Sequence, residues 1–193
     1  MSTVKSKQLQ VGTSATSTDN FTIYQPATPD GTLRIGVGNA DNPTEVGRFN
    51  SNGYVATNAP AFSAYSSAIR TISSGTFTKV IFDTERFDTN ANYDTSTYRF
   101  TPTVAGYYQI NFSLDVGTSA GASQSVCSIY KNGSYYSAGV NLSGSVTFYG
   151  NSISSLVYCN GLTDYIEAYV YIGASTASYS GPSNFDGHLA RAV

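Results

Sequence analysis

The residues suited to acid–base or nucleophilic catalysis are few in this sequence. His188 is the single imidazole, and it lies between Gly187 and Leu189 in a stretch that resembles a closing strand. Ser is common, but no Gly-x-Ser-x-Gly elbow precedes a helix, as a nucleophilic Ser of that hydrolase class requires. We therefore expect His188 to be structural, at an interface or a strand end, and we expect no catalytic residue.

Carboxylates gather around the segment after Phe82, at Asp83, Glu85, Asp88 and Asp94. Such a group suggests either a pair of catalytic acids or oxygen ligands for calcium. The alternative is a set of solvated loop acids, with Asp94 in YDTST capping a turn through its side chain. We favour the second interpretation, and expect no metal site and no cofactor.

Two cysteines, Cys127 and Cys159, fall in predicted strands. A buried reduced thiol packs as a small hydrophobe, and synthesis in a cytosol disfavours disulfides. A bridge across a barrel is the alternative. Two thiols and one imidazole do not predict a metal site.

Composition points to an all-β protein with an uncharged polar surface. The chain has 193 residues, 16 Tyr, 10 Phe and no Trp, and 40% of its residues are hydrophobic. Only 11% are charged, against roughly 25% in average globular chains. The net charge is −2 and no basic stripe is present, which argues against nucleic-acid binding.

A series of eight positions, most of them aromatic, runs through the stretch from Phe82 to Phe112. Its positions are Phe82, Asp88, Tyr93, Phe100, Gly106, Tyr108, Ile110 and Phe112. The last four alternate, so they predict a strand with one buried face. The arrangement resembles the aromatic motif of the complement C1q globular head, in the tumour necrosis factor (TNF)-like superfamily. Seven of these eight positions match that motif; Ile110 replaces an aromatic residue.

The resemblance covers about 60–193 and includes AFSAY, VCSIYKNG, LVYCNGLTDYIEAYVY and NFDGHLARAV. It implies a ten-stranded jelly-roll sandwich head that assembles as a homotrimer. Strand 163–172 carries bulk on both faces, which fits one face in the protomer core and one against a neighbour. An inner strand of a sandwich with a half-exposed Tyr face is the alternative. The head strands are expected at 61–66, 68–72, 77–82, 96–101, 106–116, 123–131, 135–142, 145–158, 163–172 and 184–192.

Residues 1–59 are expected to form a separate, β-rich base. Asn-Gly, Asp-Gly and Asn-Pro signals divide short strands at 7–11, 21–25, 32–38, 45–49 and after 53. The apolar residues are too few for a stable monomer of this size, but three copies side by side could pool their apolar faces. LRIGVGNADNPTEVGRFNSNGYV also looks like β-rich modules near the bases of bacteriophage tail fibres and spikes. We expect this base to trimerise and to attach to a particle.

The N-terminus MSTVKSKQLQ lacks the apolar core of a signal peptide, and no apolar run is long enough to span a membrane. The expected location is a virion whose proteins are made in the host cytoplasm, without membrane insertion.

The leading hypothesis is a bacteriophage virion structural protein, a trimeric tail fibre or spike whose head mediates attachment to the host cell surface. Its partners would be two further copies, another virion structural protein through 1–59, and a host receptor, glycan or protein. One alternative is a binding module of a bacterial or spore surface. Another is a glycan-degrading spike enzyme, which the absence of a convergent acid pair or triad disfavours.

The expected receptor surface is the end of the head away from its chain termini, because binding residues concentrate on loops of a rigid scaffold. Counting antiparallel strands backward from the C-terminus places the loops 117–123, 143–145 and 173–184 at this end. The long loop 84–95 is expected to reach the same half. The candidate receptor contacts are Tyr179, Asn184, Ser178, Ser119 and Asn90.

Overall fold

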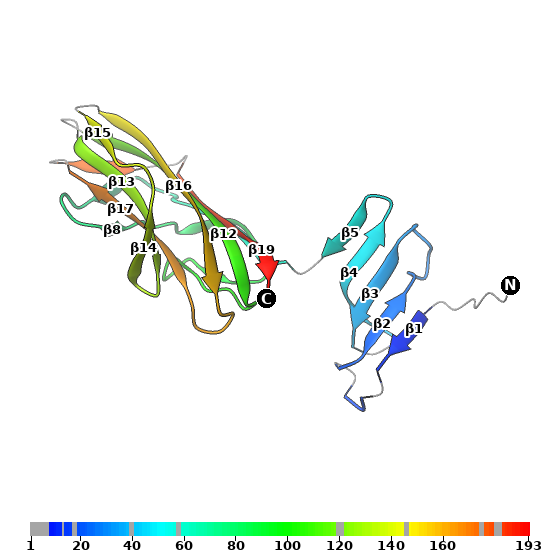
Figure 1. The fold of residues 1–193 in the computed structure, drawn as a ribbon. Coiled ribbons are helices and arrows are strands. Elements are labelled where there is room, and N and C mark those ends of the chain that lie inside the picture. The colour runs from blue at the N-terminus through cyan, green and yellow to red at the C-terminus, as the bar shows by residue number, and fades with distance from the viewer. Residues whose placement is uncertain are drawn as a thin grey trace. The chain divides into compact units, whose positions relative to one another are not determined.

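The protein, described by a computed structural model, forms two compact units, Met1–Ala59 and Pro60–Val193. We call them the base and the head. The structure describes residues 8–12, 14–16, 19–38, 41–56, 59–118, 122–144, 147–173, 176–179 and 183–193. Within these residues the regular elements are strands, β1 to β19, with one brief helical turn at Asp19 (Figure 1).

The base is one antiparallel sheet in which each strand pairs with the next along the chain. Its strands are β1 (Gln8–Val11), β2 (Phe21–Tyr24), β3 (Leu33–Val37), β4 (Thr44–Asn50) and β5 (Gly53–Ala56). The tight connection between the last two has Gly53 at a positive φ of 114°, a conformation that glycine adopts at little cost. The meander therefore follows the turn signals of the sequence.

One face of the base sheet is apolar and open to solvent. Residues paired across antiparallel strands share a face, and the register pairs Leu9 with Ile23, Val11 with Phe21, and Leu33 with Phe49. The exposed members of this apolar face are between 46% and 60% accessible: Leu9, Val11, Phe21, Leu33 and Phe49.

The opposite face of the base sheet is partly covered by the chain itself. Thr22 is completely buried there. A side chain on Gly36 would collide with Pro43 and Tyr24, so glycine allows the loop before β4 to lie against the sheet. The base consequently has one covered face and one uncovered apolar face.

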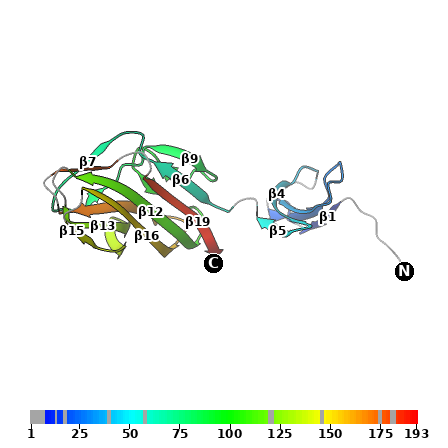
Figure 2. The same ribbon diagram turned by 90° about the horizontal axis from the view of Figure 1, so that it is seen from above.

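The head is a sandwich of two antiparallel sheets (Figures 1 and 2). In the first sheet, which we call the flank sheet, the strand order is β10-β11-β17-β13-β14, with β15 beside β13 and β8 beside β17. Its strands are β8 (Thr78–Lys79), β10 (Tyr93–Asp94), β11 (Arg99–Phe100), β13 (Ala122–Lys131), β14 (Ser134–Ala138), β15 (Leu142–Gly144) and β17 (Ile166–Ile172).

The second sheet, which we call the terminal sheet, contains the first and last strands of the head. Its order is β7-β18-β12-β19-β6-β9, with β16 paired to β12. Its strands are β6 (Ala61–Tyr65), β7 (Arg70–Ile72), β9 (Thr84–Asp88), β12 (Gly106–Thr118), β16 (Phe148–Cys159), β18 (Ala177–Tyr179) and β19 (Asn184–Ala192).

The aromatic series of the sequence forms the core between the two sheets. Phe82, Phe100, Tyr108 and Ile110 are fully buried, and Tyr93 and Phe112 nearly so. The ring of Phe62 stacks on that of Phe100 with centroids 4.2 Å apart. Stacked and edge-on ring pairs of this kind add to the hydrophobic contribution of burial. The inference that these positions are core residues is thus confirmed.

Gly106 begins β12 for a packing reason. A Cβ at this position would lie 2.4 Å from the carbonyl oxygen of Arg191 and 2.7 Å from the Leu189 side chain. Neighbouring β19 therefore approaches the backbone of β12 more closely than any side chain would permit. The glycine of the aromatic motif is required by this close approach.

Both ends of the head chain lie at the same end of the sandwich. The Leu189 N–H donates to the Pro60 carbonyl at 2.9 Å, and the Val193 N–H donates to that of Ala105 at 3.2 Å. From Gly106, β12 runs to the other end, which we call the tip. The C-terminal ends of β12, β15 and β17 therefore lie at the tip, which is the end where strand counting placed the loops that follow them.

The segment 84–95 differs from expectation. It is a strand, not only a loop: β9 pairs antiparallel with β6, with Asp88 opposite Phe62 and Thr84 opposite Tyr65. This pairing brings the segment after Asp88 to the terminal end, where the Thr89 N–H donates to the Ala61 carbonyl at 3.0 Å. The prediction that this segment reaches the tip half of the head is therefore wrong for the residues from Asp88 onward.

Candidate functional site

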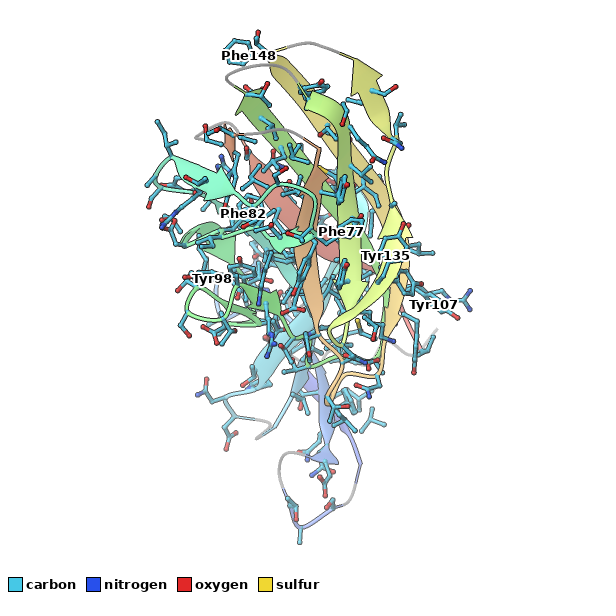
Figure 3. All side chains as sticks on the ribbon, turned by 90° about the vertical axis from the view of Figure 1, so that its left-hand side faces the viewer. Phe77, Phe82, Tyr98, Tyr107, Tyr135 and Phe148 are labelled. Atoms are coloured by element: carbon cyan, nitrogen blue, oxygen red, sulfur yellow. The ribbon has the colours of Figure 1, made fainter. Side chains whose placement is uncertain are left out.

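The tip carries a shallow hollow over Gly117 of β12. In the register, Gly117 lies opposite Phe148 of β16 on one side and Ser178 of β18 on the other. The Phe148 ring lies 3.5 Å from where a Gly117 Cβ would stand, so the missing side chain opens the hollow. Figure 3 shows Phe148 at this end of the head. The hollow is lined by Gly117, Thr118, Phe148, Thr176, Ala177 and Ser178.

Phe148 is the tip residue that sequence reasoning missed. Its side chain is 74% exposed, whereas its neighbour Tyr149 is buried and bonded through its hydroxyl to Ala122 and Gly144. Alternation shows that the two rings face opposite ways, but it does not say which one is inside. An exposed ring beside small hydroxyl side chains is a suitable contact for a partner.

Tyr179 does not have the exposed position expected of it. The side chain is only 3% exposed and belongs to the head core. Its hydroxyl accepts the Ile81 N–H at 2.7 Å, and burial raises the pKa of this phenol. Tyr179 thus ties β18 to the segment before β9. It offers no ring to a receptor, so its assignment as the aromatic contact is corrected.

The other predicted contacts are spread over the head. Ser178 is half-buried in the wall of the tip hollow. Asn184 begins β19 opposite Ser113, about midway along β12, and its amide accepts from the Ser113 hydroxyl at 2.5 Å and donates to Asp186. Asn90 lies at the terminal end, beside Thr89. The prediction that it contacts a receptor at the tip is therefore wrong. Ser119 lies outside the described residues.

The clustered acids are occupied by local structure. Asp83 accepts from the Ser67 N–H and hydroxyl, both at 2.8 Å, and pairs with Arg70. Asp88 accepts the Tyr93 N–H at 2.6 Å. Asp94 caps its turn through Ser96 and Thr97, whose hydrogen bonds lower the pKa of Asp94 to about 2. The turn cap expected of Asp94 is thus confirmed, whereas Glu85 and Asp88 belong to strand β9 and not to a loop.

No group of three or more His, Cys, Asp or Glu able to hold a metal ion occurs among the described residues. His188 is exposed on β19, opposite Gln109 and Ala61. In the described part of the chain no helix is long and apolar enough to cross a membrane.

Glu167 is the most deeply buried charged group of the head. It is 1% exposed, although it lies on the outward face of β17. Its Oε1 accepts from Lys79 Nζ at 2.6 Å and from Arg99 Nε at 2.8 Å. Lys79 also donates to the Thr97 carbonyl at 2.5 Å. One carboxylate therefore holds β8, β11 and β17 together.

We expect Glu167→Gln to destabilise the head by about 2 kcal/mol, because hydrogen bonds to charged groups contribute about 1.5–3 kcal/mol. Lys79 and Arg99 remain partly exposed, so water compensates some of the loss. Urea titration measures the change, with Glu85→Gln on exposed β9 as the control. Equal stability of the two variants would contradict a structural role for this carboxylate.

Cys127 and Cys159 are buried free thiols. Burial raises the pKa of Cys159 to about 11 and raises the pKa of Cys127 further. Since the thiolate is the reactive form, we expect neither residue to react with iodoacetamide in the native protein at about pH 8, where an ordinary Cys is partly ionised. Both should react in urea. Mass spectrometry counts the adducts, and rapid native labelling of either thiol would contradict this packing.

The outward face of the terminal sheet has an apolar area near its terminal end. Tyr107 of β12 is paired with Tyr158 of β16, with ring centroids 5.5 Å apart. Leu156 lies on the same face and is 51% exposed. A hollow lined by Tyr107, Leu156, Ala190 and Arg191 adjoins these side chains. We call Tyr107, Leu156 and Tyr158 the terminal-sheet patch.

Comparison with known proteins identifies the head by its fold. No family model and no curated protein matches the sequence. Among solved structures, the globular domain of zebrafish complement 1qA matches with a TM-score of 0.54 and 19% identity, over 70% of this chain and 99% of that one. The Eiger TNF of S. frugiperda matches with a TM-score of 0.54 and 9% identity, over 70% and 93% of the two chains. The head therefore has the complement C1q/TNF-like jelly-roll fold, as the aromatic motif predicted.

A further match reaches beyond the head. The PRD1 vertex protein P5 is similar with a TM-score of 0.53 and 14% identity, over 94% of this chain and 86% of that one. A coverage of this extent includes most of the base as well as the head. The fold of most of this chain is thus similar to that of the PRD1 vertex protein P5.

Proposed function

We propose that this chain is a structural protein of a bacteriophage virion, a trimeric fibre or spike whose head attaches to the host cell surface. The observation that carries the proposal is the likeness to the PRD1 vertex protein, because it spans base and head together.

Trimerisation is supported by two uncovered apolar surfaces. The base sheet exposes Leu9, Phe21 and Phe49 on one face, and a single sheet layer needs a second layer to bury such a face. The head exposes the terminal-sheet patch. Both surfaces carry the side chains that interfaces bury. Two further copies of the same chain would cover them in a closed symmetric assembly.

The attachment role of the head is supported by the tip. Phe148 and Ser178 line a hollow there, far from the chain ends of the head. A base that joins another virion protein and a tip that meets the receptor would divide the two tasks between the two units. The glycan-degrading alternative has little support, because the acids that prompted it are capping turns or paired.

The proposal is tested by particle assembly. Particles are produced from a gene lacking codons 1–59 and from the intact gene, and their proteins are quantified by mass spectrometry. We expect the intact chain in purified particles and the truncated head only in the soluble fraction. Incorporation of the truncated head at the wild-type level would contradict the attachment role of the base. Absence of the intact chain from particles would favour the bacterial or spore surface module.

A further inference from the structure

Five places in this chain have Asn or Asp directly before Gly. In such a pair the backbone nitrogen of Gly can attack the side-chain carbonyl carbon of the residue before it, because Gly has no side chain to hinder the approach. The attack requires the Asn or Asp side chain to leave its hydrogen-bond partners first, so the folded structure decides which pair reacts. The pairs are Asp30-Gly31, Asn52-Gly53, Asn132-Gly133, Asn160-Gly161 and Asp186-Gly187.

Asn132, in the head, is held at the turn between β13 and β14. Its Nδ2 donates to Asp164 Oδ1 at 2.7 Å, and its Oδ1 accepts the Tyr165 N–H at 2.9 Å. Both the donor and the acceptor of this amide are therefore engaged with the segment before β17. The turn itself is tight, with Asn132 at a positive φ of 53°.

Asn160, also in the head, is held by more bonds. Its Oδ1 accepts the N–H groups of Leu162, Thr163 and Asp164 at 2.9, 2.9 and 3.1 Å. Its Nδ2 donates to the Thr163 hydroxyl at 2.9 Å. An Asn that bonds the backbone after it organises the turn, so this side chain reaches the Gly161 nitrogen only if the turn between β16 and β17 opens.

The side chains of the two Asp-Gly pairs are engaged as well. Asp30 accepts from the N–H and the hydroxyl of Thr32 at 3.0 and 2.6 Å, and from Arg34 at 2.5 Å. These hydrogen bonds lower the pKa of Asp30 to about 2, and an ionised carboxylate resists attack by a nucleophile. Asp186 accepts the Ser63 hydroxyl at 2.5 Å within strand β19.

Asn52, in the base, is the exception among the five. It lies in the two-residue connection between β4 and β5 (Figure 1) and is exposed, as is Gly53. Its backbone N–H donates to Asn50 Oδ1 at 2.8 Å, but its side-chain amide has no hydrogen-bond partner among the described residues. Beyond the chain neighbours of Gly53, no atom lies within 4 Å of where a Cβ of Gly53 would stand. The side chain is therefore free to turn toward the Gly53 nitrogen.

The strand that follows Asn52 gives the hairpin little further support. β5 is an edge strand of the base sheet and pairs with β4 alone. Hairpin ends with exposed backbone hydrogen bonds open at a lower free-energy cost than the interior of a domain. The Asn52-Gly53 pair thus combines a free side chain with a backbone that opens locally.

We propose that Asn52 is a site of spontaneous deamidation, and that the base ages chemically while the two Asn-Gly turns of the head stay intact. The Gly53 nitrogen loses its proton to water and forms a bond to the side-chain carbon of Asn52. The C–N bond of the amide breaks, and ammonia leaves after taking up a proton from water. A second water molecule then opens the five-membered imide at either carbonyl, which gives Asp or isoaspartate.

The product differs from Asn52 in charge and, as isoaspartate, in backbone length. Each converted chain gains one negative charge. Isoaspartate adds a methylene group to the backbone between Asn50 and Gly53, which are paired in the register, so β5 should be held less firmly against β4. The inference goes beyond the proposed function and does not depend on it.

The test follows the Asn-Gly pairs of one chain in the same sample. The full chain is kept at mildly alkaline pH, in buffer and in parallel in urea, and peptides from timed samples are analysed by mass spectrometry. Replacement of the amide by a carboxyl raises the mass, and chromatography separates isoaspartate from Asp. The control variant is Asn52→Ser, which removes the amide and keeps the backbone N–H that bonds Asn50.

We expect Asn52, Asn132 and Asn160 to convert at similar rates in urea, where the native hydrogen bonds are lost. In the native chain Asn52 should still convert, and the other two should convert at least about tenfold more slowly than Asn52. Each net hydrogen bond that must break first slows a reaction by about two- to tenfold, and Asn132 has two such bonds and Asn160 four. The Asn52→Ser variant should show no product in the peptide that contains position 52.

Three outcomes would overturn the inference. The first is conversion of native Asn132 or Asn160 as fast as Asn52, which would mean that their hydrogen bonds give no protection. The second is a native Asn52 that stays intact although it converts in urea, which would mean that the assembled protein covers or holds this hairpin. The third is that no Asn-Gly pair converts even in urea.

Discussion

The full chain is expected to have a mass in solution three times its 20.5 kDa, and a variant with Phe21→Asp and Leu156→Asp is expected to be a monomer. Phe21 lies on the open face of the base sheet and Leu156 in the terminal-sheet patch, each at least half exposed in the single chain. Asp at either position is therefore solvated in the monomer. In the trimer it would be buried without a counter-charge, which is strongly unfavourable.

The measurement is light scattering coupled to gel filtration at micromolar concentration. A matched control carries Val55→Asp on the other face of the base sheet and Phe87→Asp on β9, both exposed apolar positions outside the two proposed contact surfaces. We expect this control to remain trimeric. A monomeric wild-type chain, or a trimeric Phe21→Asp, Leu156→Asp variant, would contradict trimerisation through these surfaces.

The second large effect is expected from Phe100→Ala, which should destabilise the head by roughly 3–5 kcal/mol, as for a large ring removed from a packed core. Phe100 is completely buried between the sheets. Its ring stacks on that of Phe62 and lies edge-on to that of Tyr108, with the latter two ring centroids 5.4 Å apart. Alanine would leave a cavity that these neighbours, fixed in strands β6 and β12, fill only in part.

Denaturant titration of the head transition measures this change. Phe87→Ala is the comparison, since an exposed ring on an edge strand is expected to change stability by about 0.5 kcal/mol or less. A loss below about 1 kcal/mol for Phe100→Ala would fall outside the range for buried rings, and would contradict the packing described for the core.

The core could be predicted from sequence because its pattern is local. Tyr108, Ile110 and Phe112 alternate within one strand, and the motif residues Phe82 and Phe100 precede it at positions that the family resemblance identifies. Buried and exposed side chains alternate along β12, and Tyr108, Ile110 and Phe112 all face the core. The sequence also indicated that β17 carries bulky side chains on both faces. The structure shows that Glu167, on its outward face, is buried.

The errors came from features that local sequence does not contain. β9 has the sequence TERFD and lies at the edge of its sheet; edge strands often carry charged residues, so the pattern resembled a loop. Tyr179 is held by the Ile81 backbone, a contact between distant parts of the chain. The rings of Phe77, Tyr130 and Tyr171 likewise meet from the residue before β8, from β13 and from β17, which only the tertiary fold brings together.

Competition for adsorption tests the central claim, attachment through the head, most directly. Host cells are incubated with the purified full chain, with residues 60–193, or with residues 1–59, and the fraction of particles that adsorb is then counted. We predict that the full chain reduces adsorption as its concentration rises, that the head alone reduces it more weakly because fewer copies act together, and that the base has no effect. Undiminished adsorption at saturating concentrations of the folded, trimeric full chain would contradict the account.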